Sequence, residues 1–378
     1  MPPKKKRVLG RGMAELVDGS FSSMIEPAAE PARSASQPTP APEPPGSAKE
    51  PATTSPAQPE PVARHVRTPS PRQPMLPSRE SETHTTIPPA SSTAPSPEPA
   101  APAPPASPRP FDVISVSSGK GGTGKSVLTS NLGVLLAPGT RVTILDADLG
   151  LANIHILFNL MPRYNASHVI TGERTLDEVI IQGPRGLGII PGGSGIPELA
   201  SLTEGRFSSL VNGISALDRT TDLLLIDTPS GIDRQSLTFL LASDQVLVVT
   251  TEDVTAMTDA YAVIKTVMTR RPDATVTLVV NQARSYADGL ETFHKVSHVA
   301  RKFLGRELTL GGVVPFDEMV ERSVAERLPV ALSHPDCPAS RAMASVASRI
   351  GSFHSRSQRA AQPFTARLKR LLSSPAPR

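Results

Sequence analysis

An eight-residue glycine-rich segment, Gly119–Ser126, most constrains how this chain can fold. It reads GKGGTGKS and fits the pattern GxxxxGK[ST]. The apolar run FDVISVS precedes it, and the helix-like run SVLTSNLGVLLA overlaps its last residue and continues the chain. Glycines in such a loop let consecutive backbone N–H groups turn toward an anion at the positive end of the following helix. The segment therefore predicts a strand, loop and helix unit that binds phosphate.

General phosphate chemistry assigns roles within this loop. Lys125 is expected to neutralise the β and γ phosphates of a nucleotide, and Ser126 is expected to offer its hydroxyl to Mg²⁺. This geometry does not require the second lysine, Lys120. The predicted nucleotide contacts are Gly119, Lys120, Gly121, Gly122, Thr123, Gly124, Lys125, Ser126 and Val127.

Short β-branched or apolar runs recur along residues 111–350, each closed by a turn and followed by a helix-like stretch. Near-continuous apolar strands predict burial of both sheet faces. We therefore expect an α/β fold with a mostly parallel, twisted sheet and helices on both faces, and ligands beyond the carboxyl ends of the strands. The runs are FDVISVS, RVTILDAD, LGIIPG, TDLLLIDT, DQVLVVTT, ATVTLVVN and LTLGGVVP.

Composition sets the parts before and after this domain apart. Most of the 41 prolines precede residue 111, and residues 25–110 are mainly Pro, Ala, Ser and Glu. Such a segment cannot bury enough apolar surface to offset its chain entropy, so it is predicted to be a disordered linker. Residues 1–24 form a basic peptide ahead of it, and residues 351–378 form a basic tail.

Cysteine use and hydropathy indicate the compartment. The single cysteine, Cys337, excludes a disulfide framework and a multi-cysteine metal site. The sequence contains no run of 18 apolar residues, and no apolar stretch directly follows the basic N-terminal residues. These features predict a cytoplasmic protein.

The loop SGKGGTGKS resembles the deviant Walker A loop of the MinD/ParA family of P-loop ATPases. This resemblance implies ATP and Mg²⁺ as cofactors. It also implies that Lys120 reaches the phosphates bound to a partner subunit, so that ATP would join two copies of the chain in a homodimer.

Two aspartate-containing segments resemble the switch regions of this family. In LDADLGLAN, Asp148 matches the residue that orients the attacking water, and Asp146 lies nearer the metal region. The strand DLLLIDT ends at Asp227, which resembles a Walker B carboxylate of the Mg²⁺ shell. The resemblance thus implies Asp148, Lys120 and Lys125 as catalytic residues, and Ser126, Asp146, Asp148 and Asp227 at the metal.

Two later positions resemble the family's base-recognition sites. Asn281 ends the strand TVTLVVN and matches an asparagine that contacts adenine. Pro315 and Asp317 lie in GVVPFD, which matches the loop over the base. An ordinary turn residue is the alternative interpretation of Asn281.

Three segments resemble one branch of the family, the flagellar-number regulators called FlhG, FleN or YlxH. They are DADLGLANIHILF, IIPGGSGIPELASL and VTTEDVTAMTDAYAVIK, which contains Asp259. The resemblance implies control of flagellar position or number, with an FlhF-like GTPase or a flagellar transcription or switch protein as partner. Two departures leave room for another cargo: Glu252 follows Thr251 without the usual proline, and DTPSG replaces DTGAG.

The basic tail contains an amphipathic pattern. Phe364, Leu368, Leu371 and Leu372 fall at i, i+4, i+7 and i+8 of a helix predicted over residues 363–374. With its flanking cations, this stripe predicts weak binding to an anionic membrane, strengthened when two subunits pair. Reversible association with the inner face of the cell membrane follows. A helix packed on the domain or on a partner is the alternative.

Two further hypotheses concern nucleic acid and the N-terminus. The basic surface leaves open a ParA-like partition ATPase that binds nucleoid DNA and moves a DNA or protein cargo. A scaffold that binds ATP without hydrolysing it is a third possibility. KKKRVLGRGMAELV, residues 4–17, resembles the N-terminal peptide of ParB-type proteins, which implies that Arg11 modulates a neighbouring ATPase; a solvated basic end is the alternative.

Overall fold

The computed structural model describes residues 111–149, 152–193, 204–356 and 362–373. The basic peptide with Arg11 and the linker at 25–110 lie outside these ranges, as do parts of DADLGLAN and IIPGGSGIPELASL. Their predicted roles therefore remain predictions.

One eight-stranded sheet forms the centre of the described fold, in the order β3-β4-β2-β5-β1-β6-β7-β8. Neighbouring strands are parallel, apart from β3 with β4. The predicted mostly parallel sheet is confirmed; only the two-residue β3 was not expected, since so short a run carries no pattern. The strands are β1 (Asp112–Ser118), β2 (Val142–Asp146), β3 (Ile181–Gln182), β4 (Gly188–Ile190), β5 (Leu223–Asp227), β6 (Gln245–Thr250), β7 (Thr275–Ala283) and β8 (Thr309–Pro315).

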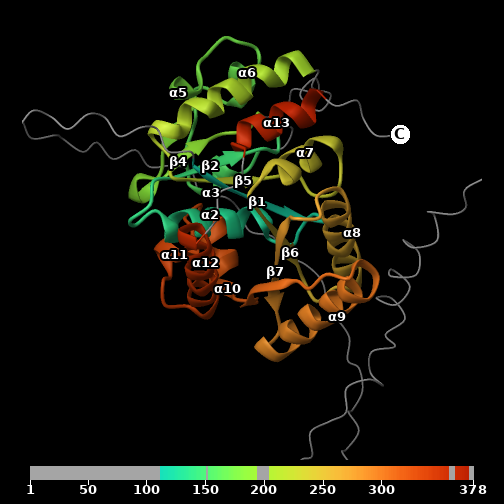
Figure 1. Ribbon diagram of the computed structural model, residues 1–378. Coiled ribbons are helices and arrows are strands. Elements are labelled where there is room, and N and C mark those ends of the chain that lie inside the picture. The colour runs from blue at the N-terminus through green and yellow to red at the C-terminus, as the bar shows by residue number, and fades with distance from the viewer. Residues whose placement is uncertain (1–110, 150–151, 194–203, 357–361, 374–378) are drawn as a thin grey trace, which may run out of the picture. The chain divides into compact units, whose positions relative to one another are not determined.

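Helices cover both faces of this sheet. Figure 1 shows α2, α10, α11 and α12 on one side, α5, α6, α7 and α13 on the other, and α8 and α9 beside β6 and β7. The helices are α2 (Lys125–Leu136), α3 (Ile154–Leu157), α4 (Ala166–Ile170), α5 (Leu176–Val179), α6 (Glu204–Ser215), α7 (Arg234–Ala242), α8 (Val254–Arg270), α9 (Tyr286–Leu304), α10 (Glu318–Ala325), α11 (Val330–Ser333), α12 (Pro338–Arg356) and α13 (Phe364–Ser373).

Strand residues alternate between separate apolar cores. On β5, Leu223 and Leu225 pack in the core that contains α2 and α12, whereas Leu224 and Ile226 pack in the core that contains α6 and α13. All residues of β5 are buried, which explains its uninterrupted apolar run.

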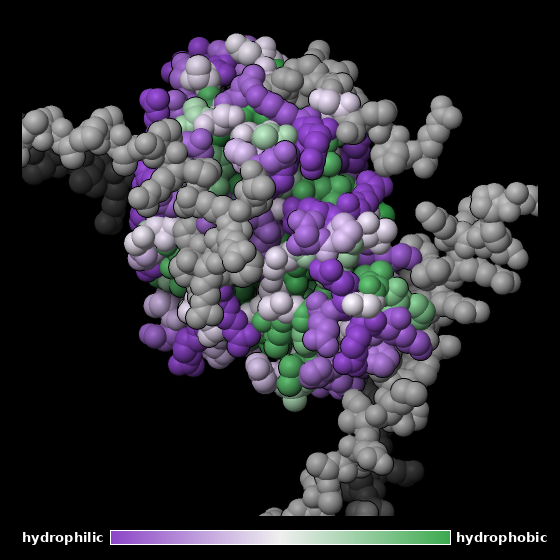
Figure 2. Space-filling model, in the orientation of Figure 1, coloured by the Kyte–Doolittle hydropathy of each residue, from purple (hydrophilic) through white to green (hydrophobic). Residues whose placement is uncertain are grey.

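Figure 2 shows polar side chains over much of the outer surface, with apolar side chains in separate areas of the visible face.

The C-terminal helix α13 packs against the domain. Phe364 and Leu368 are 4% and 0% exposed, and Leu371 and Leu372 lie against the same core. In this structure the apolar side of α13 faces α6 and α7, as the alternative interpretation of a packing helix expects, and membrane binding by this stripe stays a prediction. In the part of the chain that the structure describes, no helix has both the length and the apolarity to cross a bilayer.

A buried arginine holds α13 in place. Arg367 is 8% exposed, and its Nε donates a hydrogen bond to the carbonyl oxygen of Ala242, the last residue of α7. Its Nη2 forms an ion pair with Asp244, whose other carboxylate oxygen accepts from the backbone N–H of Val113 in β1. The helix is thus joined by polar contacts to both α7 and the central sheet.

Candidate nucleotide site

The glycine-rich loop connects β1 to α2 at the carboxyl edge of the sheet. Gly122 and Gly124 have φ angles of 84° and 80°, in the left-handed region that favours glycine. A Cβ on Gly119 would lie 2.1 Å from the backbone carbonyl carbon of Asp259 in α8. The loop therefore requires glycine both for its shape and for its close approach to α8, where TDAYA lies.

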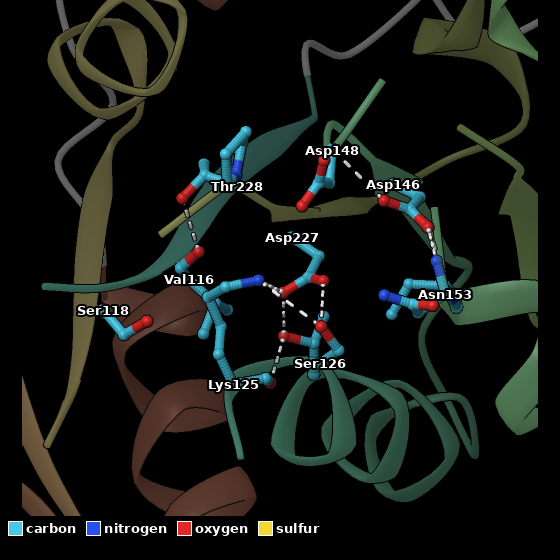
Figure 3. Close-up of polar contacts among 12 residues, drawn as sticks. Val116, Ser118, Lys125, Ser126, Asp146, Asp148, Asn153, Asp227 and Thr228 are labelled. Atoms are coloured by element: carbon cyan, nitrogen blue, oxygen red, sulfur yellow. Dashed lines mark hydrogen bonds and ion pairs between the residues drawn. The ribbon is translucent and has the colours of Figure 1, made fainter. Parts of the chain in front are cut away.

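Lys125, Ser126 and Asp227 form the centre of the site. Lys125 Nζ lies 2.8 Å from Asp227 Oδ1, and Ser126 Oγ donates to Asp227 Oδ2 at 2.6 Å (Figure 3). Asp227, at the end of β5, is 2% exposed. The structure thus brings together the predicted phosphate lysine and two of the predicted Mg²⁺ residues.

Thr129 was missed by the sequence analysis. Its hydroxyl lies 3.2 Å from Asp227 Oδ1 and 2.9 Å from the carbonyl oxygen of Lys125, one helical turn earlier. Thr129 lies four residues after Lys125, and side chains at this spacing share a helix face, so the sequence could have indicated that Thr129 lies near the phosphate lysine.

Asp146 lies beside Asp227 and holds the following loop. The two aspartates are register partners on adjacent strands β2 and β5. Asp146 Oδ2 accepts from the backbone N–H groups of Asn153 and Ile154, and Oδ1 from that of Asp148. Burial, and then the nearby Asp227 carboxylate, raises the pKa of Asp146 to about 7. In this structure Asp146 therefore holds the loop after β2, the segment that resembles the first switch.

Asp148 lies on the loop directly after Asp146. Figure 3 shows Asp148 next to Asp146 and above Asp227 in that view. Within the described ranges, no three His, Cys, Asp or Glu side chains form a ready metal site. Mg²⁺ does not require one, because it is commonly held by one or two carboxylates together with substrate phosphates and water. The Ser126 hydroxyl and Asp227 fit such a partial ligand set.

The segment that resembles the second switch, Thr228–Gly231, is held against β1 at two points. Thr228 Oγ1 donates to the carbonyl oxygen of Val116 at 3.0 Å, and the N–H of Gly231 donates to that of Ser118 at 2.8 Å. Gln235, in the first turn of α7, donates through Nε2 to the carbonyl oxygen of Ala147. This hydrogen bond joins the start of α7 to the loop that follows β2.

Lys120 has different partners from those of Lys125. Its Nζ lies 2.9 Å from Asp253 Oδ2 and 2.8 Å from Thr255 Oγ1, at the start of α8. The hydrogen bond from Lys120, followed by those from Thr255, lowers the pKa of Asp253 to about 2. Both members of the ion pair are nearly half exposed. The second lysine of the loop is therefore neutralised within the same subunit.

A pocket beside the loop collects the predicted base residues. Its cavity volume is about 260 Å³, just below the range of about 300–1,000 Å³ typical of small-molecule sites. Its lining includes five of the residues predicted from the sequence to contact a nucleotide: Gly124, Val127, Asn281, Pro315 and Asp317. Phe316, which belongs to the predicted base loop GVVPFD, also lines the pocket, as does Gln282, which the sequence did not indicate.

The polar residues of this pocket also have structural partners. Asn281 Nδ2 donates to the carbonyl oxygen of Thr123 in the loop at 2.9 Å. Asp317 accepts from the backbone N–H groups of Met319 and Ala339. Partial burial opposes ionisation of Asp317, but these amide hydrogen bonds, with that from Ala339 the stronger, lower its pKa overall. Asp317 thus caps α10 and anchors the start of α12.

These features define a P-loop nucleotide-binding protein: a parallel sheet, a glycine cradle after β1, a lysine and serine at the helix start, and an aspartate on the adjacent strand. The family model of the CobQ/CobB/MinD/ParA nucleotide binding domain matches residues 114–330, more than half of the chain. The chain belongs to this family.

Two bacterial relatives and one solved structure illustrate the similarity. The chain is 36% identical over 245 residues to the antiactivator FleN of Pseudomonas aeruginosa, covering 65% of this chain and 88% of FleN. It is 35% identical over 225 residues to the flagellum site-determining protein YlxH of Helicobacter pylori, covering 57% and 73%. The septum site-determining protein MinD of Pyrococcus horikoshii OT3, solved with Mg-ADP, has the same fold, with a TM-score of 0.54, 24% identity and coverage of 64% and 96%.

Proposed function

We propose that this protein is an ATP-hydrolysing switch that dimerises on ATP and controls the position or number of a cellular structure, flagella in the first place. The observation that carries the enzymatic part is the convergence of Lys125, Ser126 and Asp227 beside the glycine cradle. Similarity to FleN and YlxH supports the flagellar part. The family membership and the Mg-ADP bound to a structural neighbour support ATP and Mg²⁺ as cofactors.

The proposed chemistry is phosphoryl transfer to water. Bound Mg²⁺ supplies charge that balances the phosphate oxygens. The loop amides and Lys125 hold those oxygens, whereas Ser126 and Asp227 bind the metal. Asp148 positions the attacking water, a role that needs orientation more than basicity. Hydrolysis is slow and stimulated by a partner, so bound ATP acts as a timer.

Lys120 links this chemistry to dimerisation. Its ion pair with Asp253 joins two exposed side chains, and such contacts contribute little to stability. Lys120 is therefore free to exchange Asp253 for the phosphates bound to a second copy of the chain. The second copy and a flagellar regulator, either an FlhF-like GTPase or a transcription or switch protein, are the proposed partners.

Membrane association requires α13 to leave its position on the domain. The apolar residues needed for an anionic membrane are the ones that pack beside α6 and α7. Gln235 in the first turn of α7 contacts Ala147, and Arg367 of α13 contacts Ala242 at the other end of α7, so a change in the loop after β2 can reach α13 through one short helix. We therefore assign the protein to the cytoplasm and, after release of α13, to the inner face of the membrane.

Co-sedimentation with anionic liposomes, and separately with duplex DNA, tests this proposal in ATP, ADP or no nucleotide. Wild type should bind liposomes only with ATP, and Leu371→Glu should abolish that binding. Arg367→Ala should increase binding without nucleotide, because it weakens the docking of α13. Arg349→Ala is the matched control, since Arg349 donates to the Leu310 carbonyl oxygen from α12 on the other face.

Other outcomes assign a different role. ATP-dependent and salt-sensitive DNA binding without liposome binding would indicate the ParA-like alternative. Nucleotide-dependent dimers that release no phosphate would indicate a scaffold.

A further inference from the structure

The end of β7 is irregular where it meets the glycine-rich loop. β7 pairs with β8 through Val280 and Val313, and the next pair is Ala283 with Pro315. β7 therefore has one more residue than β8 between these pairs, which defines a bulge containing Asn281 and Gln282. Bulges re-aim side chains and occur frequently beside active sites.

Both bulge residues reach the loop through side-chain amides. Asn281 Nδ2 lies 2.9 Å from the carbonyl oxygen of Thr123, and Gln282 Nε2 lies 3.4 Å from that of Gly122. Gln282 has a φ angle of 55°, an unusual conformation for a residue with a side chain. The bulge thus directs two consecutive side chains to two consecutive loop carbonyls.

The contact from Asn281 is buried and tightly fitted. Asn281 and Thr123 are 6% and 4% exposed, so water does not readily replace the amide as a partner for the carbonyl. A Cβ on Gly124 would lie 2.3 Å from Asn281 Nδ2, which shows how closely the loop approaches this amide. Asn281 also lines the pocket beside the loop.

We propose that Asn281 is a positioning residue for the phosphate loop and, through the same amide group, couples the base pocket to phosphate binding. An amide offers two N–H donors and one acceptor, so the bond to Thr123 leaves polar capacity for a ligand in the pocket. This inference rests on the proposed function in one respect, that the loop binds the phosphates of ATP.

The physical reason is preorganisation. A loop of glycines has many accessible conformations, and a ligand that must first order it binds more weakly. The bond from Asn281 fixes the Thr123 carbonyl and the turn into Gly124, immediately before the amides at the start of α2. Loss of Asn281 should therefore weaken binding even of a phosphate ligand that has no base.

Calorimetric titration of the full chain with ATP and with inorganic tripolyphosphate, both with Mg²⁺, separates the two roles. Asn281→Ala should lower the affinity for both ligands, by about two- to tenfold for tripolyphosphate, which corresponds to one net hydrogen bond. Phe316→Ala is the control, because Phe316 lines the pocket and is 54% exposed. It should lower the affinity for ATP and leave that for tripolyphosphate unchanged.

Hydrogen exchange of the ligand-free proteins provides a second readout that does not depend on titration. Asn281→Ala should accelerate amide exchange in residues 119–126, whereas Phe316→Ala should not. If Asn281→Ala is poorly folded, Asn281→Ser, which retains a short polar group, is measured in the same way. Reduced ATP affinity with unchanged tripolyphosphate affinity and unchanged loop exchange would overturn the inference while leaving the proposed function intact. Failure of wild type to bind either ligand would overturn both.

Discussion

Lys120 Nζ lies 2.9 Å from Asp253 Oδ2, across 133 residues of sequence. The ion pair places the second lysine of the phosphate loop against the first turn of α8. Asp253 is also the N-cap of that helix, since its side chain accepts from the backbone N–H of Thr255. One carboxylate thus serves both the loop and the helix, which makes it a sensitive position for testing how Lys120 is used.

Removal of the Asp253 charge should favour the ATP-bound dimer. Asp253→Asn keeps a good N-cap residue but weakens the hold on Lys120. If Lys120 must leave Asp253 to reach a partner's phosphates, the dimer dissociation constant should fall by about threefold, as expected for an exposed ion pair. Analytical ultracentrifugation with a non-hydrolysable ATP analogue measures this constant.

Glu252→Gln is the control for this experiment, because Glu252 pairs with Arg284 rather than with Lys120. It should leave the dissociation constant unchanged. A dimer that is equally strong or weaker in Asp253→Asn would contradict the exchange of partners by Lys120.

The same ion pair should be visible in acid unfolding. Folding lowers the pKa of Asp253 from 3.8 to about 2, so the folded state binds this proton less readily than the unfolded state. The contact therefore stabilises the folded chain above about pH 4, and this contribution is lost as the pH falls toward 2. Urea unfolding at fixed pH should show that the stability difference between wild type and Asp253→Asn shrinks over this window. Lys120→Met should show the same behaviour; a difference independent of pH would argue against the ion pair.

Asp227 should be the most costly carboxylate to remove. Asp227→Ala leaves Lys125, whose side chain is only 10% exposed, without its anionic partner. Removing one member of a buried ion pair typically costs about 3–5 kcal/mol, and Mg²⁺-dependent nucleotide binding should be lost as well. Urea unfolding gives the first quantity and calorimetry with and without Mg²⁺ the second.

The matched control is Glu291→Ala, which removes an exposed i,i+4 partner of Lys295 in α9. Its effect on the free energy of unfolding should stay near 0.3–0.5 kcal/mol. Comparable losses in the two variants would mean that Lys125 does not depend on Asp227.

Local patterns predicted the sheet and the phosphate loop because each signal lies within one short segment. A buried strand, a glycine loop and a helix are consecutive from Asp112 to Leu136, and Asp227 follows its own apolar strand directly. The roles of Asp148 and Lys120 came from resemblance and remain predictions.

Long-range contacts could not be predicted in this way. Asn281 reaches Thr123 across 158 residues, and no local pattern marks that pairing. The stripe on α13 shows a different limit: its apolar spacing indicates that one face is covered, but protein and membrane interiors are both apolar. Only the packing of Phe364 and Leu368 against the domain distinguishes them in this structure.

The close packing of the phosphate loop on α8 should make Gly119 irreplaceable. In Gly119→Ala, the new Cβ would lie 2.1 Å from the backbone carbonyl carbon of Asp259, and a backbone atom in a helix cannot move aside as a flexible side chain does. The loop must then shift away from α8, so nucleotide affinity should fall at least tenfold and the thermal midpoint should drop. Gly351→Ala is the control: its Cβ would make an ordinary contact at 3.5 Å with Leu136, and alanine favours the helix by up to about 1 kcal/mol. Calorimetric ATP titration and thermal unfolding of both variants test this, and wild-type affinity in Gly119→Ala would show that the loop does not need its contact with α8.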